Sequence, residues 1–526
     1  MVPAAELTYN TSATALEMAN VIFGAGATVE DATYSGWNQS SAIYSNGDAL
    51  SDFATPADTG VILSTGRASD FTNASGQANQ RTNTTTNTPG ADNDALFNAA
   101  AGTSTFDASI LTVDFIPDTD KLSIQFTYSS EEYPEFVNSI FNDLVGVWVN
   151  GNYVELAVGT GDSNIGNINA GSNQNLFVDN SADDHNTEMD GFTVSLTLTL
   201  NVIPDIVNTI RIGVADVADP NFDSNLLIAA DSIQNEVLLG DDEFDIKQDG
   251  TRIIDVLEND LEETGGTLTI THINGQSVVA GDTVTLSTGQ EVTLNADGTF
   301  TVKTDDDIDS INFTYQAEND DGVDDVAFVT INTIPCFVAG TRIMTPDGER
   351  RVETLIPGDM VETYDNGMQP IRWVGTRTVT ADGQIAPIRI APGALGAHRA
   401  LTVSPQHRVL VRDQAAQLYF GQSEVLVTAK DLVNGLTVSR LADGSSVTYI
   451  HILFDEHQLV YSEGLLSESF LPGPQTMQGF PPETVAEICK LFPELDPETG
   501  AGYGPASRRS LKAFETLLLL DQARAA

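Results

Sequence analysis

Short runs of alternating apolar and polar residues recur along this 526-residue chain and limit what it can fold into. Stretches such as KLSIQFTYSS (121–130), GFTVSLTLTLNVIP (191–204) and NTIRIGVADV (208–217) repeat with a period of two residues. That period places successive side chains on opposite faces of a β-strand. Clusters of Asn, Asp, Gly and Pro between the runs supply turns. The sequence therefore predicts a mainly β protein, and its length predicts several domains.

The composition and the periodicity change along the chain and divide it into four regions. Residues 1–235 predict a β-sandwich or jelly-roll. Residues 236–335 predict a Greek-key sandwich of the immunoglobulin type. Residues 336–475 are again β-rich, and residues 476–526 change to the helical period of a short α-helical C-terminal extension. We expect four parts with these boundaries.

Local signals add detail to three of these regions. The first region contains one predicted helix near Ala13–Phe23, and the polar, aperiodic residues 68–105 predict a long loop. An Asp-Gly turn at 295–299 (NADGT) predicts a hairpin in the second region. PPETVAEICKLFPEL and SRRSLKAFETLLLLDQARAA predict two amphipathic helices in the C-terminal extension.

Negative charge is concentrated in the first two regions. The chain has 23 Lys and Arg against 75 Asp and Glu, a net charge of −52. Residues 1–335 carry −46 of this charge, and residues 336–526 carry −6. Such an acidic surface repels nucleic acid and anionic membranes, so neither is an expected partner. It suits high salt or a calcium-rich exterior, where carboxylates coordinate Ca²⁺.

The N-terminal sequence MVPAAELTYNTSATALEMANVIFGAG lacks the basic segment and the apolar core of a signal peptide. No window approaches 18 uninterrupted apolar residues, so no transmembrane helix is expected. The composition leaves two alternatives, a cytoplasmic protein or a protein exported by a route that recognises a different export signal.

The first cysteine stands at the border where the charge changes. Cys336 lies in IPCFVAGTRIMTPDG (334–348), and the chain has one other cysteine, Cys489. Two cysteines do not make a disulfide framework. Three explanations of Cys336 remain: a buried core residue, one half of a single bridge to Cys489, or a nucleophile at the first position of a new domain. For Cys489 we expect a place in the core of the first C-terminal helix.

A thiol at the first residue of a domain can attack the carbonyl group immediately before it. This N-to-S acyl shift replaces the Pro335–Cys336 amide with a thioester. Because an amide is a poor electrophile with a poor leaving group, the site must activate the thiol and protonate or strain the amide. A hydroxyl and an imidazole three residues apart, Ser404 and His407 in LTVSPQHRVLV (401–411), can supply these contacts.

At these residues the chain resembles the Hint superfamily of hedgehog autoprocessing domains and inteins. CFVAGTRIMTPDGERRVETLIPGDMVETYDNG matches the opening block, and Ser404-Pro405-Gln406-His407 matches the Thr-x-x-His block with Ser in place of Thr. Residues 447–470 match the closing block and carry His457. The resemblance covers about 140 residues and implies an all-β horseshoe fold. It implies Cys336 as nucleophile, with Ser404, His407 and His457 as further catalytic residues and no cofactor. His398 and His451 are expected to be ordinary histidines.

One departure from inteins narrows the expected chemistry. Inteins end in His-Asn before Cys, Ser or Thr, whereas this chain reads Leu466-Ser467-Glu468-Ser469-Phe470. Splicing by Asn cyclisation is therefore not expected. Attack on the thioester by water, a thiol or an amine would cleave the chain at 335/336 or transfer residues 1–335 to an acceptor. The rigid acyl group of Pro335 is expected to slow this step.

The acidic front half resembles two families of surface and secreted proteins. TYSSEEYPEFVNSIFNDLVGVWVNG (127–151) and GVADVADPNFDSNLLIAADS (213–232) resemble the choice-of-anchor L domain, and residues 236–335 resemble bacterial Ig-like or cadherin-like repeats. Their acidic loops supply candidate Ca²⁺ ligands. Those candidates are Glu131, Glu132, Asp143, Asp216, Asp219, Asp223, Asp255, Glu258 and Asp260.

Together these features indicate a modular, acidic, secreted or surface-exposed bacterial protein that autoprocesses at Cys336. The alternative is a structural or adhesive extracellular protein whose Hint domain is an inactive scaffold. One form of this hypothesis makes the adhesion calcium-dependent. Expected partners are an acceptor nucleophile and a cell-surface or glycan ligand. A calcium-dependent glycan binder would be stabilised by Ca²⁺.

Overall fold

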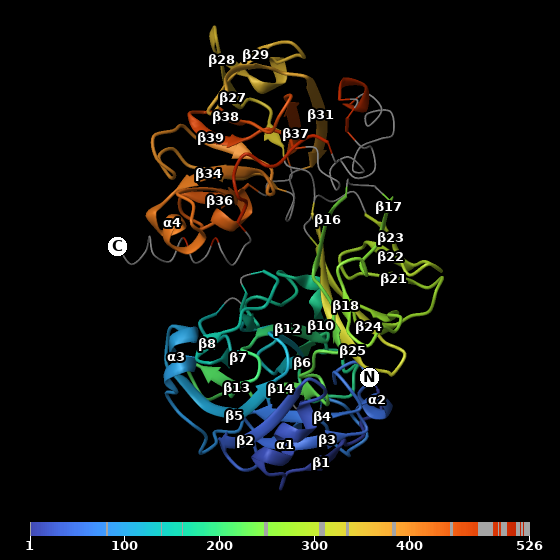
Figure 1. The fold of residues 1–526 in the computed structure, drawn as a ribbon. Coiled ribbons are helices and arrows are strands. Elements are labelled where there is room, and N and C mark those ends of the chain that lie inside the picture. Colours follow the sequence, from blue (N-terminus) through green and yellow to red (C-terminus); the bar gives the residue numbers. More distant parts are fainter. Residues whose placement is uncertain are drawn as a thin grey trace. The chain divides into compact units, whose positions relative to one another are not determined.

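The computed structural model is mainly β, as the sequence predicts (Figure 1). The chain folds into two compact units. The first unit comprises Met1–Asp242, Ile254–Thr301 and Ile311–Thr330, and the second comprises Glu243–Ile253, Val302–Ser310 and Ile331–Ala526. The structure describes residues 2–79, 83–137, 139–159, 161–246, 251–304, 311–332, 336–380, 386–441, 445–471, 488–492, 494–495, 502–511, 516 and 519.

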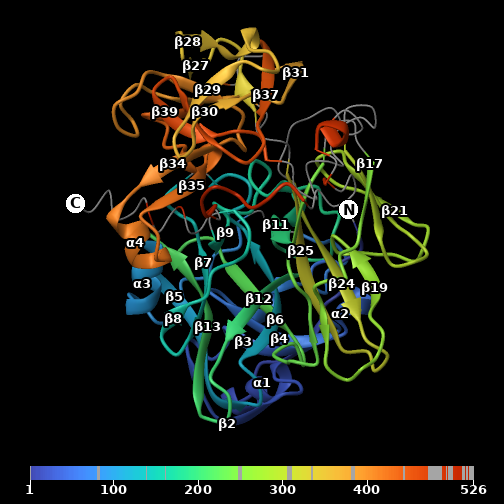
Figure 2. The same cartoon turned by 45° about the horizontal axis from the view of Figure 1, so that its top comes forward.

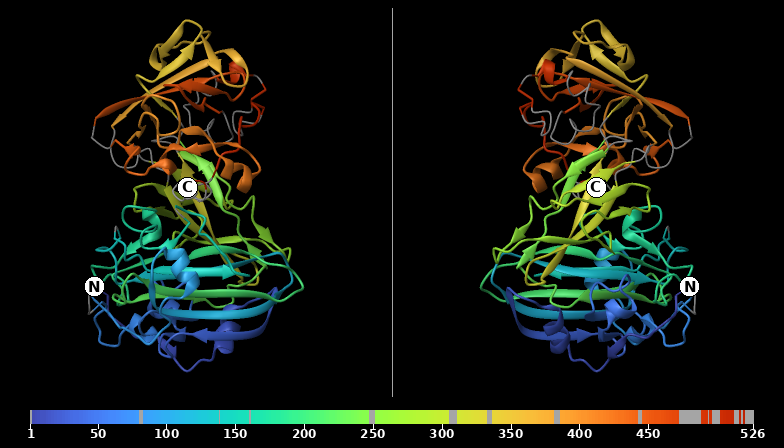
Figure 3. Two further views of the ribbon diagram at one scale, coloured as in Figure 1. Left: turned by 90° about the vertical axis from the view of Figure 1, so that its left-hand side faces the viewer. Right: turned by 90° about the vertical axis from the view of Figure 1, so that its right-hand side faces the viewer.

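Two antiparallel sheets share one apolar core in the first unit (Figures 1 and 3). One sheet runs in the order β1 (Thr8–Asn10), β3 (Ser41–Ser45), β4 (Thr59–Ser64), β14 (Ser224–Ala229), β6 (Lys121–Ser130), β11 (Gly191–Thr193) and β10 (Phe177–Asp179), and β12 (Leu196–Asn201) also pairs with β6. The other runs β2 (Ala27–Ser35), β5 (Thr105–Pro117), β13 (Asn208–Val217), β7 (Leu144–Val149) and β8 (Asn152–Tyr153), and β9 (Ser163–Asn164) also pairs with β7.

The period-two pattern of β6 shows how the sequence builds this sandwich. Leu122, Ile124, Phe126 and Tyr128 all lie in the shared core. The intervening side chains therefore point to the opposite face of the sheet. Two acidic residues, Glu131 and Glu132, directly follow β6 in the chain.

The predicted helix near Ala13–Phe23 is confirmed as α1 (Ala15–Ile22), which a capping box of Thr14 and Glu17 begins. The predicted long loop over 68–105 is partly wrong, because it contains a 3₁₀ turn at Ala68–Phe71 and α3 (Ala95–Ala101). Asp94 accepts hydrogen bonds from the first amides of α3, and Gly102 ends the helix with φ of 67°. These capping residues, together with the fully buried Phe97, stabilise a helix in a polar segment.

The Ig-like region adds further strands, most of them to the first unit (Figure 2). In chain order they are β15 (Val237–Leu238), β16 (Asp242–Asp245), β17 (Thr251–Ile254), β18 (Leu261–Glu262), β19 (Thr269–Ile273), β20 (Gln276–Ser277), β21 (Thr283–Thr285), β22 (Glu291–Leu294), β23 (Phe300–Lys303), β24 (Ile311–Glu318) and β25 (Asp324–Asn332). Of these, β16 and β17 lie mostly in the second unit, and β23 and β25 end in it. The predicted hairpin at 295–299 is confirmed, since Asn295 N donates to Thr299 O at 2.8 Å. Phe328 joins the core cluster of the first sandwich, and Gln125 Nε2 donates to Asp324 O at 2.9 Å.

Two sheets form the second unit. One runs β31 (Trp373–Thr380), β37 (Ser446–Leu453), β26 (Phe337–Val338), β33 (Leu401–Val403), β32 (Ile388–Ile390) and β36 (Val438–Arg440). The other runs β28 (Gly348–Arg351), β27 (Arg342–Thr345), β38 (Leu459–Ser462), β39 (Leu465–Glu468), β34 (Arg408–Arg412) and β35 (Glu424–Thr428), and β29 (Met360–Thr363) pairs with β38 and with β30 (Gly367–Pro370). A helix, α4 (Gln414–Phe420), connects β34 to β35.

The C-terminal extension is helical in part. Residues 488–491 are helical, as predicted, and so are residues 516 and 519. The predicted second helix is wrong at its start, because residues 507–511 are not helical and Ser510 bridges Leu426 of β35 in parallel. The reason is tertiary: Leu426 N donates to Arg509 O at 2.8 Å, and Leu511 N donates to Leu426 O at 2.9 Å. An edge strand with open backbone groups outweighs helix propensity here.

In the part of the chain that the structure describes, no helix combines the length and the apolar composition needed to span a bilayer.

Candidate functional site

Cys336 stands directly before the short strand β26, between two other strands of its sheet. Phe337 pairs with Val403 of β33 on one side and with Ile450 of β37 on the other. This register places Cys336 beside the residue after β33, Ser404, and beside His451 of β37. Cys336 N donates to Ser404 Oγ at 2.8 Å, and Ser404 N donates to Cys336 O at 3.0 Å. The hydroxyl of Ser404 therefore holds the amide nitrogen of the peptide bond that precedes Cys336.

The thiol of Cys336 meets a histidine. Sγ lies 3.3 Å from His451 Nε2, and both residues are at least nine-tenths buried. Aromatic rings fix the imidazole on two sides: Trp373 stacks on it at 6.4 Å between centroids, and Phe470 meets it edge-on at 5.5 Å. Neither cysteine is in a disulfide, so the predicted alternative of a bridge between Cys336 and Cys489 is not formed. Cys489 packs half-buried against the cluster that contains Trp373 and Phe470.

The turn from Ser404 to His407 carries a second buried imidazole. His407 N donates to Ser404 O at 3.1 Å and Ala429 N donates to His407 O at 2.9 Å, which fixes the turn. Neither ring nitrogen of His407 has a hydrogen-bond partner among the described residues. Its ring lies 4.4 Å from that of Phe337, the residue after the cysteine. Burial lowers the pKa of His407 to about 4, against an opposing effect of Glu468. His407 is therefore a neutral imidazole with free hydrogen-bonding capacity.

His457 is held by backbone groups on both sides of its ring. Nε2 lies 3.1 Å from Ser469 O and 3.5 Å from Glu468 Oε2, and Nδ1 accepts from Ser507 N at 2.9 Å. A backbone N–H can only donate, so Nδ1 is unprotonated and Nε2 carries the proton. Its neighbour Glu468 also accepts from Arg408 N at 2.8 Å. This arrangement gives His457 the contacts of a positioning residue.

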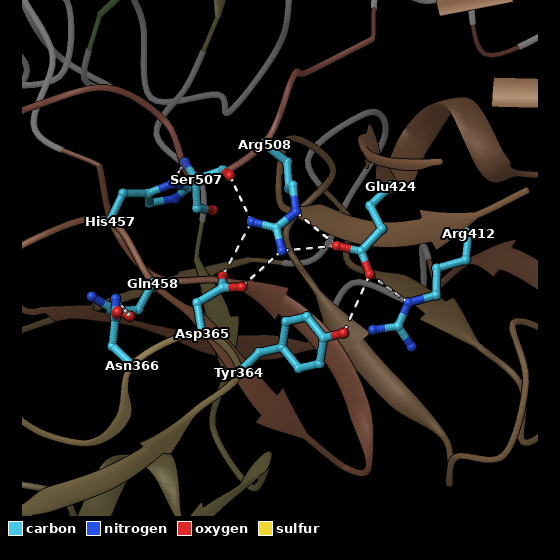
Figure 4. A network of polar contacts seen from close by, with 9 residues as sticks. All are labelled: Tyr364, Asp365, Asn366, Arg412, Glu424, His457, Gln458, Ser507 and Arg508. Carbon is cyan, nitrogen blue, oxygen red and sulfur yellow. Dashed lines mark hydrogen bonds and ion pairs between the residues drawn. The ribbon is translucent and has the colours of Figure 1, made fainter. Parts of the chain in front are cut away.

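The extended C-terminal segment supplies that contact to His457 and is itself fixed by ion pairs (Figure 4). Arg508 binds Asp365 and Glu424, each at 2.8 Å. Glu424 also accepts from Arg412 Nε at 2.8 Å, and Tyr364 OH donates to it at 3.3 Å. The C-terminal extension is thus built into the second unit.

The structure brings Cys336, Ser404 and His407 together around β26 and places His457 in the connection between β37 and β38. Pro335, the other partner of the predicted scissile bond, lies outside the described residues. The sequence reasoning missed His451, which it treated as an ordinary histidine. Its position depends on the pairing of β26 with β37, two strands more than 100 residues apart in sequence. No local sequence signal reports that pairing.

The acidic candidates in the first unit form two groups near the end of β6. Glu131 lies beside Asp223, since Glu131 N donates to Asp223 O at 3.2 Å, whereas Asp143 N donates to Glu132 Oε2 at 3.2 Å. Asp143 in turn accepts from Val217 N and from Ser224 Oγ. Burial and the neighbouring Asp143 raise the pKa of Glu132 to about 10. Burial raises the pKa of Asp143 and of Asp216 far above their usual range, since neither carboxylate is near a cation.

Most of the remaining predicted Ca²⁺ ligands accept hydrogen bonds that stabilise turns and loops. Asp219 accepts from Asn221 N, Asp255 accepts from Leu257 N, and Asp260 accepts from Gly240 N and Tyr315 OH. Glu258 is exposed. Across the described residues, no three His, Cys, Asp or Glu side chains are grouped so that they could hold a metal ion. A metal site built from carboxylates alone is therefore not present in this part of the chain.

Two protein families match the chain. Residues 335–474 match the Hint domain, and residues 7–234 match the choice-of-anchor L domain. The sequence has no match among curated proteins. The second unit thus carries a domain of the autoprocessing type. The chain contains a Hint domain preceded by an N-terminal choice-of-anchor L domain.

Similar solved structures include two inteins and an Ig-domain protein. The gp41-1 intein is 17% identical, with 25% of this chain and 97% of that chain covered and a TM-score of 0.18. The MchDnaB-1 intein is 12% identical, with 25% and 98% covered and a TM-score of 0.19. The eight N-terminal Ig domains of Down Syndrome Cell Adhesion Molecule are 8% identical, with 57% and 35% covered and a TM-score of 0.15.

Proposed function

We propose that Cys336 breaks the peptide bond between residues 335 and 336 by an N-to-S acyl shift. The observation that carries the proposal is the double contact of Cys336, whose thiol meets His451 Nε2 at 3.3 Å while its amide N–H binds Ser404 Oγ at 2.8 Å. Nucleophile, base and amide contact thus converge on one residue, as nucleophilic catalysis requires.

The chemistry proceeds in two steps. His451 takes the thiol proton, and Sγ attacks the carbonyl carbon of residue 335. As the tetrahedral intermediate collapses, the C–N bond breaks and the protonated His451 returns its proton to the amide nitrogen of Cys336. The result is a thioester on Sγ and a free amine on Cys336. Ser404 keeps the nitrogen in place, and the neutral ring of His407, on the same turn, offers a hydrogen bond to the reacting peptide group.

Water is the acceptor that we propose for the thioester. Its attack releases residues 1–335 with a free carboxylate and leaves residues 336–526 with an N-terminal cysteine. A thiol or an amine in place of water would transfer residues 1–335 to that acceptor. Splicing is not proposed, because Leu466–Phe470 contains no Asn, and Ser467 and Glu468 in this stretch are buried in β39 and its contacts.

For the first unit we propose a role outside the cell or on its surface, directed at a cell-surface or glycan partner. The strong negative charge of residues 1–335 and the match to the choice-of-anchor L domain support this role. Protease treatment of intact producing cells tests it: surface protein is degraded while cytoplasmic markers survive. Full protection of the protein, with none in the medium, would contradict the proposal.

Intact-mass analysis of the purified full chain tests the cleavage. The chain should convert over time to fragments 1–335 and 336–526, faster with dithiothreitol or hydroxylamine, and hydroxylamine should leave a hydroxamate on residue 335. Cys336→Ala should abolish both fragments, whereas the matched thiol control Cys489→Ala should cleave like the parent. A parent chain that stays intact under hydroxylamine would establish the rival function, a structural protein with an inactive Hint scaffold.

A further inference from the structure

Four oxygen-bearing side chains gather in the first sandwich where β6 ends and β14 begins, and the proposed cleavage does not use them. Ser224 pairs with Ser130, so Asp223 lies directly opposite Glu131, and Glu131 N donates to Asp223 O at 3.2 Å. Two residues from the loop before α3, Asn79 and Thr84, reach the same place. Asp223 N donates to Thr84 O at 2.9 Å, which ties this loop to the strand end.

The oxygens of these four residues lack partners although they are buried. Glu131, Asp223, Thr84 and Asn79 are 1%, 3%, 4% and 7% exposed. Both carboxylate oxygens of Glu131 lack a hydrogen-bond partner within the described part of the chain. The same holds for Asp223 Oδ2, Thr84 Oγ1 and Asn79 Oδ1. Thr84 is a donor beside Glu131, but a carboxylate can accept several hydrogen bonds, so these buried oxygens keep acceptor capacity for a ligand.

The surroundings favour a cation as the ligand. Asn79 Nδ2 donates to Asp190, which leaves Oδ1 of Asn79 without a partner among the described residues. Asp223 Oδ1 accepts from Thr86 N at 2.6 Å, which leaves Oδ2 for a further contact. Gly66 makes room for that oxygen, because a Cβ at position 66 would lie 1.8 Å from Asp223 Oδ2. Ionised carboxylates and amide oxygens can only accept, and a hard cation satisfies several of them together.

We propose that Glu131, Asp223, Asn79 and Thr84 bind one Ca²⁺ ion where β6 ends and β14 begins in the choice-of-anchor L sandwich. Ca²⁺ takes six to eight oxygen ligands in a flexible geometry that includes bidentate carboxylates and amide carbonyls. This donor set has two carboxylates and two neutral oxygens and contains no nitrogen or sulfur, which disfavours zinc and copper. Mg²⁺ keeps several waters and an octahedral shell, which a buried all-protein site supplies poorly.

The position of Glu131 and Glu132 in the chain provides a matched control. The two residues are adjacent and identical in chemistry, but Glu132 accepts from Asp143 N whereas Glu131 lies beside Asp223 and Thr84. Glu131→Gln removes a ligand of the proposed site, whereas Glu132→Gln changes the separate cluster around Asp143.

Calorimetric titration of the full-length chain, carrying Cys336→Ala and freed of metal with EDTA, tests the site. We expect one Ca²⁺ per chain, weaker Mg²⁺ binding and a Ca²⁺-dependent rise in the melting temperature of the first unit. Glu131→Gln and Asp223→Asn should each weaken Ca²⁺ binding by at least about tenfold, and Glu132→Gln should leave it unchanged. If a carboxylate variant fails to fold in EDTA, Asn79→Ala provides the same test with a neutral ligand.

Two results would overturn the site: no Ca²⁺ binding at millimolar concentration, or Ca²⁺ binding that Glu131→Gln and Asn79→Ala leave intact. Because Cys336→Ala is present throughout, neither result bears on the proposed cleavage.

Discussion

Replacement of His451 by Gln isolates the base in the proposed acyl shift. The Gln side chain is uncharged and polar, so it can keep a contact to the thiol, but it cannot accept its proton. Sγ lies 3.3 Å from Nε2 in a site where Cys336 is 7% and His451 6% exposed, so bulk water is a poor substitute base. General-base catalysis contributes about 10²- to 10⁴-fold. We therefore expect cleavage to slow by that factor, which corresponds to about 3 to 5 kcal/mol in activation free energy.

The assay is the fraction of chain cleaved at 335/336 over time, measured by intact mass with and without hydroxylamine. His398→Gln, a histidine in the same unit whose Nε2 accepts from Leu395 N, is the matched control and should cleave at the parent rate. Melting temperatures must show that His451→Gln is folded, since Trp373 and Phe470 pack on the ring. A folded His451→Gln variant that cleaves as fast as the parent would refute the assignment of the base.

Three further predictions concern the surrounding contacts. Ser404→Ala should remove the side-chain partner of the buried amide of Cys336, so the unfolding free energy measured by urea titration should fall by about 1–3 kcal/mol and cleavage should slow. Ser404→Thr keeps a hydroxyl and should retain both the stability and the cleavage rate. The pKa of His407 falls from 6.5 to about 4 on folding, so below pH 6.5 the unfolded chain binds a proton that the folded chain does not. The free energy of unfolding should therefore decrease between pH 6.5 and 4 by up to about 3 kcal/mol relative to His407→Gln, with both chains carrying Cys336→Ala. An equal pH dependence of stability in the two chains would contradict a buried neutral ring. Arg508→Ala should lower the unfolding free energy by about 1 kcal/mol, because it removes two partly exposed ion pairs, and unchanged stability would mean that these pairs contribute nothing.

Much of the fold could be predicted because its signals are local. The alternation in KLSIQFTYSS predicts β6 with its correct bounds, and the Thr14–Glu17 capping box begins α1 where the apolar helical period starts. The misses have opposite causes. The polar composition of residues 68–105 predicts a loop, although Asp94 is a local N-cap signal for α3. For residues 507–511, hydrogen bonds with β35 outweigh the helix propensity of the sequence, and no local pattern indicates those hydrogen bonds.

The candidate sites divide in the same way. The border of charge at residue 336, a thiol at that border and the Ser404–His407 spacing all lie within short stretches, so the sequence by itself indicated Cys336 as the candidate nucleophile and located the turn beside it. Only the tertiary structure decided that His451 is the residue at the thiol and that Asn79 and Thr84 join Glu131 and Asp223. Strand register and loop placement depend on pairings between distant segments, and these follow from the packing of the whole fold.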